Sequence, residues 1–167
     1  MGGSDTARLT PTVLQAFNGF DLRVDAIVGP GCTTEQEQKV RRVAKKCSAD
    51  IHVARDPDDL VERMFQADFG VSTASSATYE HLALGTPIVS IPVVDNQEPI
   101  AAALRNRDAA TVLRRDDDQH AFRTAIETYL TDADLRRRRR QLGQELVDDC
   151  GAERLFGEII SITEEYP

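Results

Sequence analysis

Residues 87–94 read Pro-Ile-Val-Ser-Ile-Pro-Val-Val and form the most apolar run of the sequence. Apart from one serine, the side chains are proline or β-branched aliphatic groups, and the latter favour an extended strand. A run that is apolar at successive positions predicts a strand buried on both faces, as in the interior of a parallel sheet. Because proline cannot donate a hydrogen bond to a neighbouring strand, Pro92 is expected at the end of this strand.

Shorter apolar runs alternate with amphipathic segments on both sides of this strand. Further strands are expected at Leu22–Val28, Ile51–Ala54, Asp68–Ser72 and Ala110–Leu113. Helices are expected at Thr10–Phe17, Thr34–Lys46, Asp58–Gln66, Thr78–Leu84, Glu98–Asn106, Gln119–Tyr129, Asp132–Val147 and Ala152–Thr163. Thr10 is the expected N-cap of the first helix, and Gly85 is expected just past the end of the fourth. This alternation predicts an α/β fold, a Rossmann-like parallel sheet with helices on both faces.

The length and composition are ordinary for a globular protein. With 167 residues, we expect one domain over residues 1–167. Lys and Arg number 20 against 28 acidic residues, and the resulting net charge of −8 disfavours nucleic acid as a partner. No apolar run is long enough for a membrane span. Cys32, Cys47 and Cys150 are far apart, which predicts a reducing, cytoplasmic location without a disulfide framework.

The chain opens on Gly2-Gly3-Ser4-Asp5, where a domain of this class normally opens on a strand. Either the first strand is absent or the chain is a fragment of a longer protein. In an open parallel sheet, ligands bind at the carboxyl ends of the strands, where loops enter helix N-termini. Adjacent glycines let the backbone approach a ligand closely, and Ser4 adds a hydroxyl. A plain flexible terminus is the alternative.

A second loop joins a strand to a helix and is rich in small polar residues. Ser75, Ser76 and Thr78 are expected to point outward together with the N–H groups that open the helix, including that of Ala77. A helix N-terminus carries partial positive charge and unpaired donors, so this loop suits a diphosphate. Glu80 lies just inside the helix, where its carboxylate can accept hydrogen bonds from two ribose hydroxyls. The alternative is a serine-rich cap with a glutamate that the helix dipole favours.

A third loop, Asp95-Asn96-Gln97, leaves the buried strand. The amide side chains of Asn96 and Gln97 offer neutral donors and acceptors suited to sugar hydroxyls. The alternative is a polar turn that caps the next helix.

Taken together, Ser76, Thr78, Glu80, the Leu84-Gly85-x-Pro87 turn, the buried strand and the Asn96-Gln97 pair resemble the C-terminal half of GT-B fold nucleotide-sugar enzymes. The pattern looks most like the UDP-sugar hydrolase of pseudaminic acid biosynthesis and, more distantly, the N-acetylglucosaminyltransferase that completes the peptidoglycan lipid precursor. It spans about Met1 to Leu130. The chain departs from it at Ala74 and Ser75, where the family often has glycines, and at Ala77, which lacks a hydroxyl.

The resemblance implies a UDP-sugar or UDP as ligand and neither a cofactor nor a metal. Nucleotide contacts would come from Gly2, Gly3, Ser4, Ser75, Ser76, Ala77, Thr78 and Glu80, and sugar contacts from Asn96 and Gln97. The function it implies is the donor half of a glycosyltransferase or of a UDP-sugar hydrolase. A non-catalytic nucleotide-sugar module and a UDP-sugar epimerase are the alternatives. The 167 residues are expected to be a fragment that lacks the N-terminal acceptor and catalytic domain of these enzymes, so no catalytic residue is assigned and the chain alone is expected to be inactive.

The remaining polar clusters are expected to be structural. His52, His81 and His120 lack metal-ligand spacing, and His81 is expected to be a structural or surface residue. The acidic run 116–118 is typical of a solvated helix cap. Five arginines at 136–140 would point around the whole circumference of a helix, so a solvated helix is favoured over a phosphate-binding or membrane-binding patch.

Overall fold

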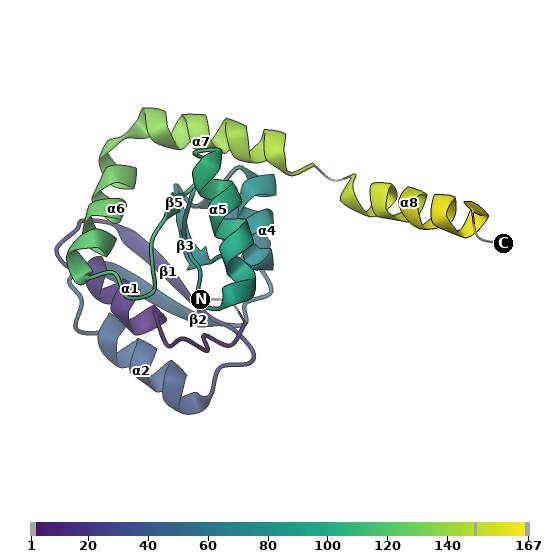
Figure 1. Ribbon diagram of the computed structural model, residues 1–167. Coiled ribbons are helices and arrows are strands. Elements are labelled where there is room, and N and C mark those ends of the chain that lie inside the picture. The colour runs from purple at the N-terminus through teal and green to yellow at the C-terminus, as the bar shows by residue number, and fades with distance from the viewer. Residues whose placement is uncertain (1–2, 149, 166–167) are drawn as a thin grey trace.

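The computed structural model describes residues 3–148 and 150–165, and it is an α/β body from which the last helix projects (Figure 1). The strands are β1 Arg23–Val28, β2 Asp50–Arg55, β3 Gly70–Thr73, β4 Ile88–Ile91 and β5 Thr111–Val112. The helices are α1 Thr10–Ala16, α2 Thr34–Ala44, α3 Leu60–Gln66, α4 Ser76–Leu84, α5 Glu98–Asn106, α6 Gln119–Thr131, α7 Ala133–Leu146 and α8 Gly151–Glu165, with a 3-10 turn η1 at Asp95–Gln97. Each predicted strand and helix is confirmed, and only η1 was not foreseen.

Strand β4 is the buried centre of the sheet, as its apolar run predicted. All of its residues are buried, and it pairs in parallel with β3 on one side and β5 on the other. Ile88 packs with side chains of α4 and α5 on one face, whereas Ile91 packs with α1 and α6 on the other. The predicted α/β, Rossmann-like arrangement with helices on both faces is confirmed, and Pro92 follows the last residue of β4.

The sheet is divided into two parts. β1 pairs in parallel with β2, and β3, β4 and β5 form a second parallel group, in that order. Within residues 3–148 and 150–165, no strand lies between β1 and β3.

Helix α1 begins differently from the prediction. Thr10 is the first helical residue and its side chain caps nothing, so the N-cap assignment was wrong. The carboxylate of Asp5 caps the start of the helix instead. It accepts hydrogen bonds from the backbone N–H of Leu9 at 2.9 Å and of Thr10 at 3.2 Å. Gly85 ends α4 in the left-handed conformation with φ of 70°, as predicted, because glycine has no Cβ to clash there.

The arginine run of α7 is solvated at most positions, but Arg139 is buried, which corrects the expectation of an entirely solvated helix. Its guanidinium donates to the Asp108 carboxylate at 2.7 Å, to the Thr111 hydroxyl at 2.6 Å and to the Tyr129 hydroxyl. The guanidinium also lowers the pKa of the Asp108 carboxyl. This one arginine therefore fastens α7 to α6 and to the edge strand β5, whereas Arg137 pairs with Asp134 at the surface.

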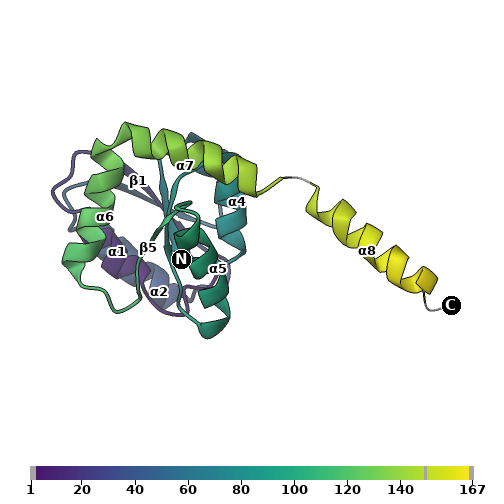
Figure 2. The same cartoon turned by 45° about the horizontal axis from the view of Figure 1, so that its top comes forward.

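Helix α8 extends away from the body in both views (Figures 1 and 2). Its large apolar side chains are exposed, among them Leu155, Phe156 and Ile159. No helix in the described part of the chain has the length and apolar character needed to cross a membrane.

Candidate functional site at the carboxyl ends of the strands

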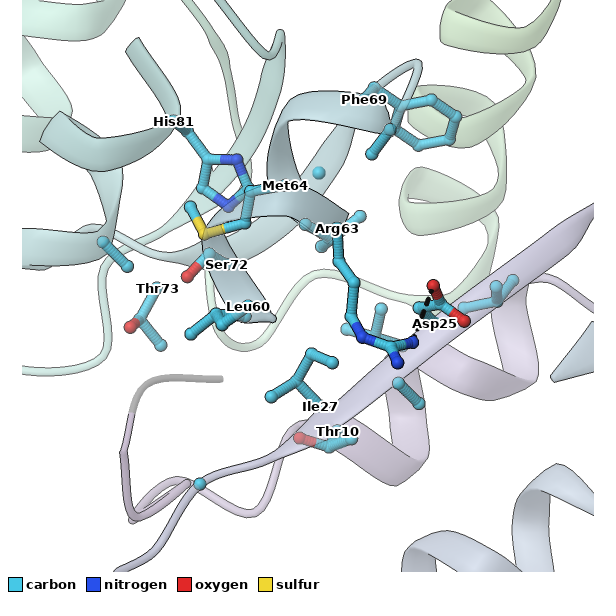
Figure 3. Close-up of a pocket in the computed structure, with 18 of the residues that line it drawn as sticks. Thr10, Asp25, Ile27, Leu60, Arg63, Met64, Phe69, Ser72, Thr73 and His81 are labelled. Carbon is cyan, nitrogen blue, oxygen red and sulfur yellow. Dashed lines mark hydrogen bonds and ion pairs between the residues drawn. The ribbon is translucent and has the colours of Figure 1, made fainter. Parts of the chain in front are cut away.

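A cavity of about 1070 Å³ opens where β1 and β3 end (Figure 3). Residues from all three predicted ligand loops line it. They are Gly3 and Ser4 of the first loop, Ser75, Ser76, Ala77 and Glu80 of the β3–α4 segment, and Gln97 of η1. Two predicted contacts, Thr78 and Asn96, are not among the lining residues, and Gly2 lies outside the described residues.

The first loop is held in place, which argues against a flexible terminus. The carbonyl oxygen of Gly3 accepts a hydrogen bond from Gly31 N–H at 2.9 Å. The side-chain amide of Gln36 donates to the carbonyl oxygens of both Ser4 and Asp5 at 3.3 Å. The loop therefore rests on the turn that follows β1 and on the start of α2, with Ser4 left exposed.

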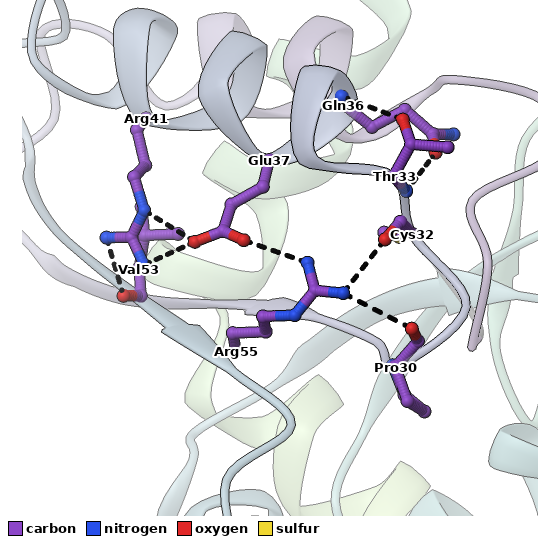
Figure 4. A network of polar contacts seen from close by, with 8 residues as sticks. All are labelled: Pro30, Cys32, Thr33, Gln36, Glu37, Arg41, Val53 and Arg55. Atoms are coloured by element: carbon purple, nitrogen blue, oxygen red, sulfur yellow. Dashed lines mark hydrogen bonds and ion pairs between the residues drawn. The ribbon is translucent and has the colours of Figure 1, made fainter.

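A polar network holds the turn that follows β1 in place (Figure 4). Arg55, at the end of β2, donates to the carbonyl oxygens of Cys32 at 2.9 Å and Pro30 at 3.3 Å. The carboxylate of Glu37 accepts from Arg55 and from Arg41, each at 2.8 Å, and these hydrogen bonds lower the pKa of Glu37. The two glycines beside Pro30 mark the turn in the sequence, but no local pattern indicates the arginine and glutamate that support it.

The N-terminus of α4 is uncapped. Ser75 occupies the N-cap position, but its hydroxyl makes no capping bond and interacts with the carbonyl oxygen and hydroxyl of Thr73 instead. No turn or side-chain hydrogen bond of the described residues engages the backbone N–H groups of Ser76 and Ala77. The alternative of a serine-rich cap is therefore wrong, and these donors are open to an anion.

Thr78 does not point outward, which corrects the sequence-based expectation. The residue is fully buried, and its hydroxyl donates to the carbonyl oxygen of Thr73 at 3.3 Å. The reason is that α4 begins at Ser76, two residues earlier than predicted, so that Thr78 falls on the side of the helix that packs inward. Its role is to hold the end of β3 against α4.

Glu80 and Gln97 face the cavity from two different elements. Glu80 is exposed on α4 four residues after Ser76, so both lie on one face of the helix. The side-chain oxygen of Gln97 accepts a hydrogen bond from Val93 N–H at 2.9 Å, which leaves its Nε2 to donate elsewhere. Asn96 is exposed and is not among the residues that line the cavity.

His81 is a buried cavity residue whose environment the sequence did not reveal. Burial lowers the pKa of its imidazole from the usual 6.5 to about 4, so the ring is neutral at neutral pH. Its Nδ1 has no hydrogen-bond partner among the described residues. The ring lies against the backbone of Gly70, where a Cβ would overlap it. No cluster of three metal-ligating side chains occurs in the part of the chain that the structure describes.

No protein-family model and no curated protein matches this sequence. Among solved structures, the chain resembles MurG of Acinetobacter baumannii, with a TM-score of 0.78 and 15% identity over 96% of this chain and 48% of that one. It also resembles WaaG, a glycosyltransferase involved in lipopolysaccharide biosynthesis, with a TM-score of 0.60 and 17% identity over 89% of this chain and 40% of that one.

The chain thus spans less than half the length of either structure. At these identities the likeness establishes the fold and leaves the ligand and the site residues as predictions. The resemblance to the UDP-sugar hydrolase likewise stays a prediction. The chain has a GT-B glycosyltransferase-like Rossmann fold, and the match supports the predicted likeness to the C-terminal domain of such enzymes.

Proposed function

We propose that this chain binds a UDP-sugar and forms the donor half of a glycosyltransferase-type enzyme. The observation that carries the proposal is the meeting of three separate loops around one cavity at the carboxyl ends of the strands. In an open α/β sheet this is the edge at which ligands bind. The two glycosyltransferases of like fold support the same assignment.

The uncapped start of α4 is the proposed diphosphate site. The N–H groups of Ser76 and Ala77 and the hydroxyl of the exposed Ser76 provide donors there, and the helix dipole favours negative charge. Gly3 and Ser4 approach from the opposite loop, where the absence of a side chain at Gly3 leaves room for the ligand. Local donors matter because the net charge of −8 offers an anionic ligand no long-range attraction.

Glu80 is the proposed ribose ligand, since its carboxylate lies one helical turn beyond Ser76 on the same face. A carboxylate can accept hydrogen bonds from two vicinal hydroxyls, and it offers the phosphates no hydrogen bond. Gln97 is the proposed sugar ligand, because its carbonyl is already fixed by Val93 and its amide group remains as a donor. Asn96 does not line the cavity and is therefore not proposed as a sugar ligand.

The proposed chemistry is departure of the UDP group from the anomeric carbon. The bond from that carbon to the diphosphate oxygen breaks as a bond to the nucleophile's oxygen forms, and the nucleophile's proton passes to a base outside this chain. The negative charge that develops on the diphosphate oxygen is stabilised by the N-terminus of α4. The nucleophile would be an acceptor hydroxyl in a transferase or water in a hydrolase. We propose that it is positioned by an N-terminal domain of a longer protein, since this chain covers 48% of MurG.

Glu80→Ala tests the assignment by calorimetry with UDP. Loss of two charge-assisted hydrogen bonds should weaken UDP binding about tenfold or more. Glu127→Ala is the matched control, because Glu127 is also exposed but lies on α6 and does not line the cavity. Unchanged affinity in Glu80→Ala removes Glu80 from the site. A folded protein that binds neither UDP nor a UDP-sugar overturns the proposal as a whole.

A further inference from the structure

Three successive carbonyl groups of the first loop are directed toward the start of α2 and the turn before it. The carbonyl oxygen of Gly3 accepts a hydrogen bond from Gly31 N–H at 2.9 Å. The carbonyl oxygens of Ser4 and Asp5 both accept from Nε2 of Gln36, each at 3.3 Å. One glutamine side chain therefore holds two of the three carbonyl groups on the same side of the loop.

These contacts also set the direction of the N–H groups of the loop. In a planar trans peptide unit, the C=O of one residue and the N–H of the next point in opposite directions. Because the carbonyl groups of Gly3 and Asp5 are directed toward α2 and its preceding turn, the N–H groups of Ser4 and Thr6 are directed away from them. Ser4 and Thr6 both line the cavity, and in the described part of the chain neither N–H donates to a turn, loop or side-chain acceptor.

The side chain of Gln36 is itself fixed by the start of α2 (Figure 4). Its Oε1 accepts a hydrogen bond from Thr33 N–H at 2.7 Å, and its backbone N–H donates to the Thr33 hydroxyl at 3.2 Å. These two bonds are the capping box of α2. Since Oε1 is engaged by the helix, Nε2 is the end of the amide that is left to reach the loop.

A glutamate at position 36 would serve the helix as well as glutamine does, but it could not hold the loop. Either residue completes a capping box, because each offers a side-chain oxygen at the third helical position. Only the amide also has a donor, whereas an ionised carboxylate only accepts hydrogen bonds and would repel the two carbonyl oxygens. In a chain with 28 acidic residues, the contact with the loop accounts for a glutamine here where the helix start alone does not.

We propose that Gln36 is a positioning residue, which holds the first loop so that the N–H groups of Ser4 and Thr6 are open to an anionic ligand in the cavity. Gln36 does not line this cavity, so it acts through the loop and not by touching the ligand. The inference rests on the proposed function for the identity of the ligand, but not for the position of the loop. The two are therefore measured separately.

The test is Gln36→Glu, which keeps the capping oxygen and removes the donor to the loop. Gln38→Glu is the matched control, because it makes the same change of charge on the same helix at an exposed position that does not line the cavity. Hydrogen exchange at the Gly31 amide reports the contact with the Gly3 carbonyl, and calorimetry with UDP reports the ligand. In Gln36→Glu, the Gly31 amide should exchange about three- to tenfold faster and UDP should bind about three- to tenfold more weakly than in Gln38→Glu.

Two further variants separate the position of the loop from the stability of α2 and from charge. Thr33→Ala removes the capping hydroxyl but keeps the Gln36 amide, so it should lower the urea midpoint and leave Gly31 exchange and UDP affinity nearly unchanged. Gln36→Glu should show the reverse, a split that a merely structural role of Gln36 would not produce. Gln36→Leu removes the donor without adding a charge, and it should weaken UDP binding as Gln36→Glu does.

Equal exchange at Gly31 in Gln36→Glu and Gln38→Glu overturns the proposal, because the loop would then be held without Gln36. Faster exchange with unchanged UDP affinity also overturns it, since the loop would not contact the ligand. Full UDP affinity in Gln36→Leu would assign the effect of Gln36→Glu to repulsion between the carboxylate and the phosphates, which overturns it as well. If the unsubstituted chain binds no UDP, the proposed function fails, and exchange at Gly31 still decides whether Gln36 holds the loop.

Discussion

The two parts of the sheet differ in how their strands are enclosed. β4 has strands on both sides and helices on both faces, and all of its residues are buried. β1 has helices near both faces but, among the residues that the structure describes, a strand on one side only, and its residues range from buried to exposed. Both are runs with β-branched residues, so composition alone does not account for the difference. What separates them is whether a second neighbouring strand is present.

The part of the sheet that contains β4 is also held by buried polar contacts. The part that contains β1 is held by contacts near the surface. Behind β4, the Tyr129 hydroxyl donates to the carbonyl oxygen of Ile88 at 2.7 Å and accepts from Arg139. Beside β1, the turn leading to the site is held by Arg55 and Glu37, both partly exposed. Substitutions should therefore cost more stability in the first region than in the second.

The largest expected effect is that of Arg139→Ala. Removal of the guanidinium leaves the hydroxyls of Tyr129 and Thr111 and the carboxylate of Asp108 without their buried partner. The free energy of unfolding should fall by about 2–4 kcal/mol, from the lost hydrogen bonds and packing of a buried side chain, because Asp108 is exposed and keeps its ion pair with Arg138. Arg137→Ala is the control within the same run, since its ion pair with Asp134 is solvent-exposed and should contribute at most about 1 kcal/mol. Urea denaturation measures the loss of stability in both variants. Similar losses would contradict the expected difference between the buried and the exposed arginine.

His81 should make stability depend on pH at the boundary between the two parts. Its pKa is about 4 in the folded protein and near 6.5 in the unfolded chain, so the unfolded chain binds the proton first as pH falls. Stability is therefore fully present above pH 6.5 and should decline by about 3 kcal/mol as pH falls to 4. The urea concentration at the unfolding midpoint, measured between pH 7 and 4.5, follows the first part of this loss of stability before most carboxylates protonate.

His81→Gln should flatten that pH dependence, because the glutamine side chain does not titrate. His120→Gln is the control, since His120 is exposed at the start of α6. If His120→Gln flattens the curve as much as His81→Gln does, burial of His81 is not its cause.

Gly29→Ala tests the contacts that hold the first loop against the end of β1. The added methyl group would come within 2.6 Å of the Gly3 Cα and carbonyl carbon, so the first loop must move away from β1. We expect a loss of about 1–3 kcal/mol, as for other overpacked positions. Gly3→Ala changes the same contact from the other side, yet its Cβ would meet no atom within 4 Å, and it should leave stability nearly unchanged. Thermal denaturation of the two variants distinguishes them.

Most of the fold, and the meeting of the three predicted loops at one cavity, could be predicted from the sequence because their signals are local. The run Pro87–Val94 carries its own evidence of burial, and the strand-to-helix order places the three loops at one edge. The division of the sheet could not be predicted, because periodicity reports which residues are buried but not which strand lies beside them. Arg139 was missed for another reason: only its spacing of four from the buried Leu135 and Gly143 distinguishes it from its neighbours.

The smallest expected effects come from two helix starts, one capped and one open. At α2 the Thr33 hydroxyl accepts from Gln36 N–H at 3.2 Å, within a complete capping box. Thr33→Ala should therefore cost about 1 kcal/mol in urea denaturation, whereas Thr34→Ala, one position later and exposed, should cost much less. At α4 the Ser75 hydroxyl caps nothing, so Ser75→Ala should cost less stability than Thr33→Ala. Equal losses for Thr33→Ala and Ser75→Ala would mean that Ser75 caps α4 in solution, and the N-terminus of α4 would then not be open to a diphosphate.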